Sequence, residues 1–136
     1  MKFLSFYRLS VITSILFILL AIIMMFAPVQ MLSGWGVELT TEVGLVVRRI
    51  AALYAGLAVM FFMVRNAEHS TTRTALIVGT ITSCLILALL GVYEFDTGHA
   101  SSGILKAVII EVALVLAFLY VGCACNNAND LNKKVG

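Results

Sequence analysis

The chain has 136 residues, of which 62% are hydrophobic and 12% charged, and its formal net charge is +2. Ordinary soluble domains are about half apolar and a quarter charged, so this chain has too few charges to cover a water-soluble globule. Its nine lysines and arginines are spread along the sequence, which argues against a nucleic-acid-binding face.

The apolar residues gather into four long runs, which cover residues 9–27, 44–64, 74–93 and 103–125. A bilayer core of about 30 Å needs about 20 helical residues, and every run meets that length. None of the runs alternates apolar with polar residues as a barrel strand does. The sequence therefore predicts an all-α polytopic membrane protein, with residues 1–136 forming a single domain built as an antiparallel bundle of four transmembrane helices.

The first run, residues 9–27, follows Lys2 and Arg8 and resembles a signal peptide in that respect. Its apolar stretch is longer than the usual signal core, and no small-x-small cleavage site follows it. We interpret it as a retained helix. Pro28 is expected to end this helix, since proline cannot continue the hydrogen-bond ladder.

The connection that follows, "PVQMLSGWGVELTTE", is the only long one and is predicted to be a loop. Trp35 stands between two glycines in it, a placement that favours an anchor at the membrane interface, where the ring is apolar and the N–H stays wet. The alternative interpretation is a lid that covers a ligand. Thr40 or Thr41 is expected to cap the second helix, with Glu42 in its first turn.

Two adjacent arginines, Arg48 and Arg49, stand about 9 Å into the second helix. They point about 100° apart, so at least one is expected to turn towards the bundle and to need a partner. Glu111, about 12 Å into the fourth helix, lies at a matching depth and is the candidate partner. An uncharged, protonated Glu111 is the alternative, and the pair could be structural or functional.

Tyr54 follows Arg49 by five residues and could extend the same polar network. The predicted ligand-binding or polar-core residues are therefore Arg48, Arg49, Tyr54 and Glu111. Small residues on the second, third and fourth helices favour close helix packing, with a homo-oligomer seam as the alternative.

Other chemistry-bearing residues give weaker signals. Cys84 is alone, and Cys123 and Cys125 form a C-x-C without a nearby histidine. Glu94 and His99 belong to a polar turn with Asp96. The sequence contains no phosphate loop, zinc-protease helix or Ser/His/Asp set, so we predict no catalytic residue, no metal, no cofactor and no enzyme.

Six of the nine cations flank the side of the membrane that holds both termini: Lys2, Arg8, Arg65, Arg73, Lys133 and Lys134. The connections on the other side carry acids: Glu38, Glu42, Glu94 and Asp96. The positive-inside rule then predicts that both termini are cytoplasmic.

Two stretches, "FAPVQMLSGWG" and "RRIAALYAGLAVMFF", resemble small bacterial four-helix membrane proteins of the DoxX-like kind and related uncharacterised families. In the second stretch an arginine precedes a tyrosine and a pair of small residues, which here are Arg49, Tyr54, Ala55 and Gly56. The resemblance implies a helical bundle in the bacterial inner membrane. Some DoxX-like proteins are associated with quinone-linked oxidoreductases.

The leading hypothesis is a non-enzymatic inner-membrane protein that acts as an accessory subunit of a larger complex or binds a lipophilic small molecule near Arg48, Arg49 and Glu111. A small proton-coupled transporter of cationic or amphipathic compounds, with Glu111 as the proton carrier, is the second. A quinone-linked redox subunit is the third, although the sequence shows no redox centre.

Overall fold

A computed structural model describes residues 5–68 and 70–135, with side chains as far as residue 123. These residues form helices and contain no strand. The elements are α1 (Phe6–Phe26), α2 (Pro28–Trp35), α3 (Thr41–Met63), a short 3-10 turn (Val64–Asn66), α4 (Thr71–Asp96) and α5 (Ile104–Val135).

Four of these helices, α1, α3, α4 and α5, are long and apolar enough to cross a membrane. Only 17% to 33% of the residues in each apolar window are buried inside the protein. Many of the remaining apolar side chains are exposed. Contact with lipid chains would be favourable for such a surface, whereas contact with water would be unfavourable. The described part of the chain therefore has the composition of a multi-pass membrane protein.

Three of the long helices begin three residues before the apolar runs, because a polar residue caps each of them. The side chain of Ser5 accepts a hydrogen bond from the backbone N–H of Arg8, at 3.4 Å. Thr40 does the same for Val43, at 3.3 Å, and Ser70 does so for Arg73. Each cap satisfies an N–H that has no partner within its own helix.

The connection between α1 and α3 differs from the expected loop, because residues 28–35 form the helix α2. Pro28 occupies the first position of α2, where its missing N–H costs nothing and its ring favours the helical backbone angle. Gly36 ends α2 with a φ of 78°, a conformation that favours glycine. Its N–H bonds to Ser33, and that of Val37 bonds to Leu32.

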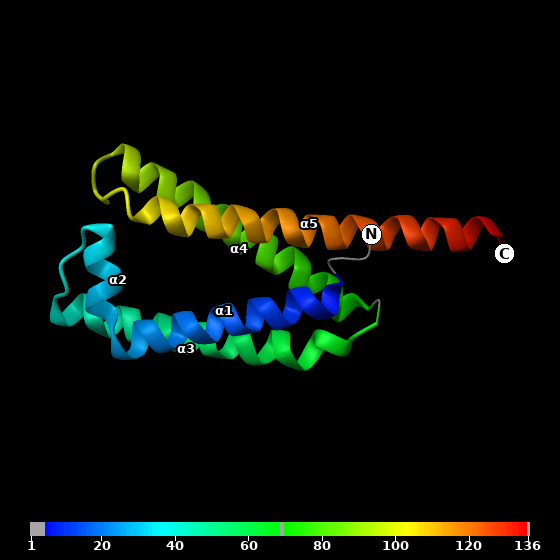
Figure 1. Cartoon of the computed structure of the whole chain (residues 1–136), viewed down its shortest axis with the longest axis horizontal. Helices are drawn as coiled ribbons and strands as arrows, with labels where there is room; N and C mark the ends of the chain where they lie inside the picture. Colours follow the sequence, from blue (N-terminus) through cyan, green and yellow to red (C-terminus); the bar gives the residue numbers. More distant parts are fainter. Residues whose placement is uncertain (1–4, 69, 136) are drawn as a thin grey trace.

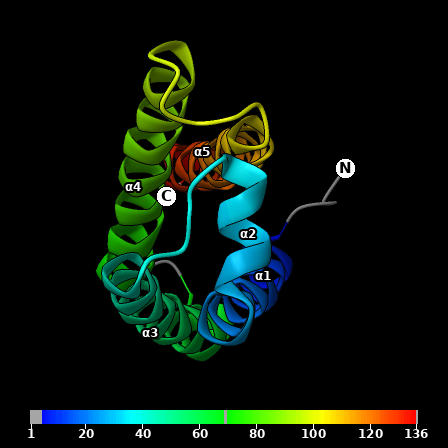
Figure 2. The same cartoon turned by 90° about the vertical axis from the view of Figure 1, so that its left-hand side faces the viewer.

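The long helices are arranged as two pairs (Figures 1 and 2), with α1 packed along α3 and α4 packed along α5. In the first pair, the Ser14 hydroxyl donates to the Ala58 carbonyl at 2.7 Å, and Ala51 and Ala58 are buried. In the second pair, Gly91 lies so close to Val108 that a Cβ would be 2.7 Å from it. Small residues thus bring each pair together, as expected from the sequence.

The two pairs meet mainly at the end where α1 begins and α3 finishes, and they diverge towards the other end (Figure 1). At this junction the rings of Phe61 and Phe118 are completely buried, with centroids 5.6 Å apart. Phe17 packs edge-on against Phe61 at 5.9 Å. Beyond the junction, α5 continues past the other helices towards the C-terminus.

The junction generates a stability prediction. Phe118→Ala should lower the free energy of unfolding by about 3 kcal/mol, because the ring is fully enclosed and its loss leaves a cavity. Leu119→Ala is the control, since the neighbouring Leu119 is 44% exposed on the apolar outer surface. The measurement is unfolding of the two variants in detergent or lipid nanodiscs. Equal stability of the two variants would mean that Phe118 does not hold the helix pairs together.

Candidate functional site

The diverging half of the molecule encloses a pocket with a volume of about 280 Å³ between the two helix pairs. All five helices contribute to its wall, and the accessible lining is mostly apolar. The apolar lining residues are Leu16, Phe17, Leu20, Met24, Met31, Ile50, Leu87, Ala107, Ile110 and Leu114. An apolar concavity of this kind, with a few polar groups, is the usual form of a small-molecule site.

Four side chains bring polar atoms to this pocket: Trp35 from α2, Tyr54 from α3, Ser83 from α4 and Glu111 from α5. Glu111 stands about 10 Å along α5 from its first residue. Its Oε2 atom is buried and makes no hydrogen bond with any residue that the structure describes. The pocket therefore contains one carboxylate with a buried oxygen that no described residue bonds.

Tyr54 is positioned by an aromatic neighbour. The ring of Phe17 lies 5.4 Å from the Tyr54 ring, centroid to centroid, with an interplanar angle of 60°. This edge-to-face contact joins α1 to α3 at the pocket wall and fixes the phenol there. Sequence analysis placed Tyr54 and Glu111 in one polar site, and the structure brings both to the same pocket.

The two arginines of the predicted site lie elsewhere. No ion pair joins Glu111 to Arg48 or Arg49 in the described part of the chain, and both arginines are exposed. The buried face of α3 carries Val47 and Ala51. At about 100° per residue, Arg48 is turned to the side of that face and Arg49 is turned almost opposite to it. Because the face of α3 that carries Val47 and Ala51 is buried, the two arginines point away from the pocket.

Arg48 lines a separate hollow of about 530 Å³ beside the first turn of α3. The hollow also receives Thr41 and Glu42, which belong to the same turn, and Pro28 from the start of α2. It shares none of its lining residues with the Glu111 pocket.

The helix α2 contributes Met31 and Trp35 to the pocket lining. It runs from α1 towards α5 and the connection between α4 and α5 (Figure 2). The backbone N–H of Ser101 donates to the Trp35 carbonyl at 2.8 Å. The Ser101 hydroxyl donates to the Gly34 carbonyl at 2.7 Å. Gly103 lies against the same carbonyl so closely that a Cβ would collide with it. Trp35 thus stands at the pocket wall, where the lid interpretation requires it, on a helix held by two hydrogen bonds.

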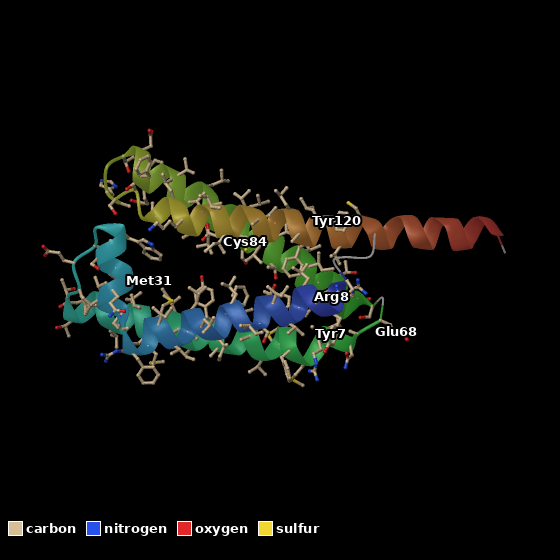
Figure 3. All side chains as sticks on the ribbon, in the orientation of Figure 1. Tyr7, Arg8, Met31, Glu68, Cys84 and Tyr120 are labelled. Carbon is tan, nitrogen blue, oxygen red and sulfur yellow. The ribbon has the colours of Figure 1, made fainter. Side chains whose placement is uncertain are left out.

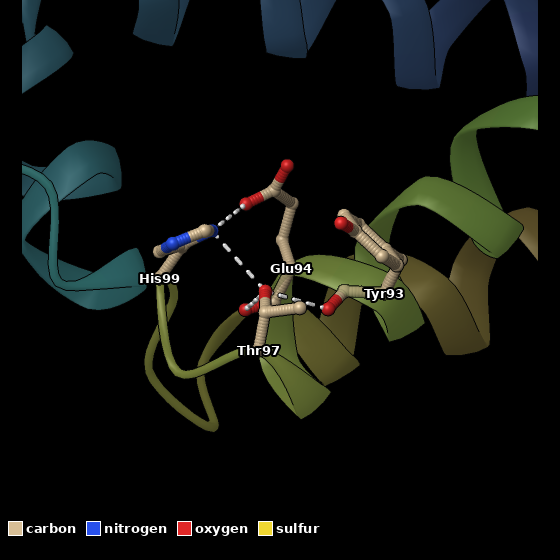
Figure 4. Close-up of polar contacts among 4 residues, drawn as sticks. All are labelled: Tyr93, Glu94, Thr97 and His99. Atoms are coloured by element: carbon tan, nitrogen blue, oxygen red, sulfur yellow. Dashed lines mark hydrogen bonds and ion pairs between the residues drawn. The ribbon is translucent and has the colours of Figure 1, made fainter.

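The polar turn after α4 is organised by its own side chains (Figure 4). The Nδ1 atom of His99 lies 3.1 Å from a carboxylate oxygen of Glu94 and 3.1 Å from the Thr97 hydroxyl. The Thr97 hydroxyl also lies within hydrogen-bond distance of the Tyr93 carbonyl. Among the side chains of residues 5–68 and 70–123, no three His, Cys, Asp or Glu are grouped to hold a metal ion.

Cys84 and Cys123 are not among the residues that line the pocket. Cys84 is buried within α4, near the middle of the helix (Figure 3), and Cys123 is exposed on α5. The side chain of Cys125 lies outside the described residues.

Comparison of the chain with protein-family models, curated proteins and solved structures finds no match. The DoxX-like resemblance accordingly stays a prediction.

Sequence analysis did not foresee that Trp35 and Ser83 would join Glu111. The signal for Trp35 was present, because Pro28 and Gly36 frame a helix of eight residues with a proline-first, glycine-last pattern. The sequence around Ser83 gives no such signal, because a serine hydroxyl within an apolar helix can also donate its hydrogen bond to a backbone carbonyl of the same helix.

The tight contact between α2 and the connection before α5 can be tested. Gly103→Ala would push a methyl group into the Gly34 carbonyl and displace α2 together with Trp35. We expect acrylamide to quench the fluorescence of Trp35, the only tryptophan, more strongly in this variant.

The matched control is Gly34→Ala, because a Cβ at Gly34 meets nothing within 4 Å. The same quenching in both variants would show that the contact does not hold α2 in place.

Proposed function

We propose that this protein is a non-enzymatic membrane protein that binds a lipophilic small molecule in the pocket between its helix pairs. In this proposal α1, α3, α4 and α5 cross the bilayer as an antiparallel bundle. The observation that carries the proposal is the mostly apolar pocket that contains the unmatched carboxylate of Glu111. A few polar groups in apolar walls orient a ligand whose body is apolar.

The pocket volume supports a small ligand. About 280 Å³ is close to the lower end of the range for small-molecule sites, which begins at about 300 Å³. Such a volume suits a compact molecule or a short chain rather than a whole lipid. If α5 crosses the bilayer as proposed, Glu111 lies about 10 Å from the first residue of that helix, so the polar end of the ligand would bind below the membrane surface.

Binding is favoured over transport by the packing at the opposite end. A transporter needs its site to be accessible from each side in turn, whereas Phe61 and Phe118 fill the junction between the helix pairs and are fully buried. Proton-coupled transport remains the second candidate, because a buried acid without a partner is what a proton carrier requires.

The proposed location is the bacterial inner membrane with both termini in the cytoplasm. Arg8, Arg65 and Arg73 lie near the end of the bundle at which α1 begins, and Glu94 and Asp96 lie near the other end. Positive residues next to membrane spans favour the cytoplasmic side. The pocket and α2 would then lie in the outer half of the bilayer.

Ligand binding is tested with azioctanol, an eight-carbon alcohol that carries a photoreactive diazirine. We expect its crosslinks to concentrate on residues that line the pocket. Leu87→Trp should reduce this labelling severalfold, because Leu87 lines the pocket and the larger ring would occupy it. The readout is mass spectrometry of the photolabelled peptides in nanodiscs.

Leu89→Trp is the control, since Leu89 is 72% exposed on the outer surface of the same helix. Labelling spread evenly over outward-facing residues, and unchanged by Leu87→Trp, would contradict the proposal.

Orientation is tested with single cysteines in a chain whose native cysteines are replaced by alanine. A membrane-impermeant maleimide added to intact cells should label Asp96→Cys and should not label Glu68→Cys, because these exposed residues lie at opposite ends of the helices. Permeabilised cells should show labelling of both. Labelling of Glu68→Cys alone in intact cells would reverse the proposed orientation.

A further inference from the structure

We propose that the ligand of the Glu111 pocket is a small lipophilic cation, namely a protonated or quaternary amine attached to a short apolar chain. This inference rests on the proposed binding function and adds the charge and class of the ligand. Three features of the pocket lead to it: the unmatched carboxylate, the aromatic wall and the lack of any cationic lining residue.

The first of these features is the carboxylate of Glu111, which needs a positive charge or a proton. Charged groups inside a membrane protein pair with an opposite charge or hold a proton, because an isolated ion in a medium of low polarity is costly. The described residues that line the pocket include no lysine, arginine or histidine, and Arg48 and Arg49 are not among them. Within this lining, a cationic ligand would supply the positive charge that neutralises Glu111.

The aromatic side chains supply the second part of the recognition. Trp35, Tyr54 and Phe17 all line the pocket with Glu111. The faces of tryptophan and tyrosine rings attract ammonium groups, and quaternary ammonium ligands are commonly held by such rings. An aromatic wall together with one carboxylate selects a cation over a neutral molecule of the same shape.

The same lining argues against lipid headgroups as the source of the cation. A zwitterionic headgroup would bring a phosphate with its ammonium, and the described lining residues include no cationic side chain to receive that phosphate. The volume of about 280 Å³ is also small for a lipid. A free amphipathic amine fits both the charge and the space.

The test uses Trp35 as the reporter, because it is the only tryptophan and lines the pocket. Octyltrimethylammonium is titrated into nanodiscs that contain the protein, and Trp35 emission gives the Kd. We expect saturable binding to the unchanged protein and a Kd that rises at least about tenfold in Glu111→Gln. Glu111→Asp, which keeps the charge, should recover part of the loss.

Glu68→Gln is the matched control. It removes one carboxylate at the end of the molecule opposite the pocket (Figure 3) and should leave the Kd unchanged. 1-Decanol, a neutral chain of similar length, checks that the pocket of Glu111→Gln is intact, since its weaker binding should be the same in both proteins. Octylphosphocholine, the zwitterionic arm, should bind more weakly than octyltrimethylammonium.

Three other results would overturn the inference, and they differ in whether the proposed binding function survives. If decanol binds while the cation does not, or if Glu111→Gln leaves the cation's Kd unchanged, the cation inference is overturned and lipophilic binding stands. If octylphosphocholine binds as tightly as octyltrimethylammonium, the free amine is replaced by a lipid headgroup. If none of the three probes binds at a saturable site, both the inference and the proposed function are overturned.

Discussion

The two helix pairs are held together at both ends and little in between, and the pocket depends on this arrangement. At one end Phe61 and Phe118 pack in the fully buried junction. At the other end Ser101 bonds to the backbone of Gly34 and Trp35 on α2. Loss of the first contact would separate the pairs, and loss of the second would open the wall that α2 provides. The pocket is thus defined by two distant contacts, which belong to different parts of the sequence.

The rotation of α3 decides which charges the pocket contains. Ala51 and Ala58 pack against α1, and the Ser14 hydroxyl bonds to the Ala58 carbonyl, so the small face of α3 is turned inward. Arg48 and Arg49 are consequently turned away from this face and are exposed. Helix packing therefore leaves Glu111 in the pocket and keeps Arg48 and Arg49, its predicted partners, out of the pocket.

The long helices could be predicted from sequence because apolar length is a direct measure of what a bilayer requires. The apolar runs begin three residues after the helices at Phe6, Thr41 and Thr71, since a hydropathy run ignores the polar residues that start a helix. Only at α3 did the sequence also indicate the cap, Thr40, with Glu42 in the first turn. The helix α2 was missed because the residues at its first position and its C-cap, Pro28 and Gly36, are of types that also occur in loops.

The candidate site was predictable only in part. Tyr54 and Glu111, which the sequence placed in one polar site, both line the same pocket. Depth along a helix could be estimated from sequence, because rise per residue is fixed. Rotation about each helix axis was not predictable in the same way, since it depends on which face finds a neighbour. The pairing of Glu111 with an arginine depended on that rotation and is absent from the described residues. The resemblance to DoxX-like proteins offered no correction, because it concerned short stretches of α1 to α3.

The pairing of neighbouring helices has a consequence for biosynthesis. Every contact between α1 and α3 lies within the first half of the chain, and every contact between α4 and α5 lies within the second half. The first helical hairpin, α1 with α3, is therefore synthesised in full before α4 begins, and its contacts can form while the rest of the chain is still being made. Only the last step, in which the hairpins find each other through the Phe61 and Phe118 rings, has to wait for the whole chain.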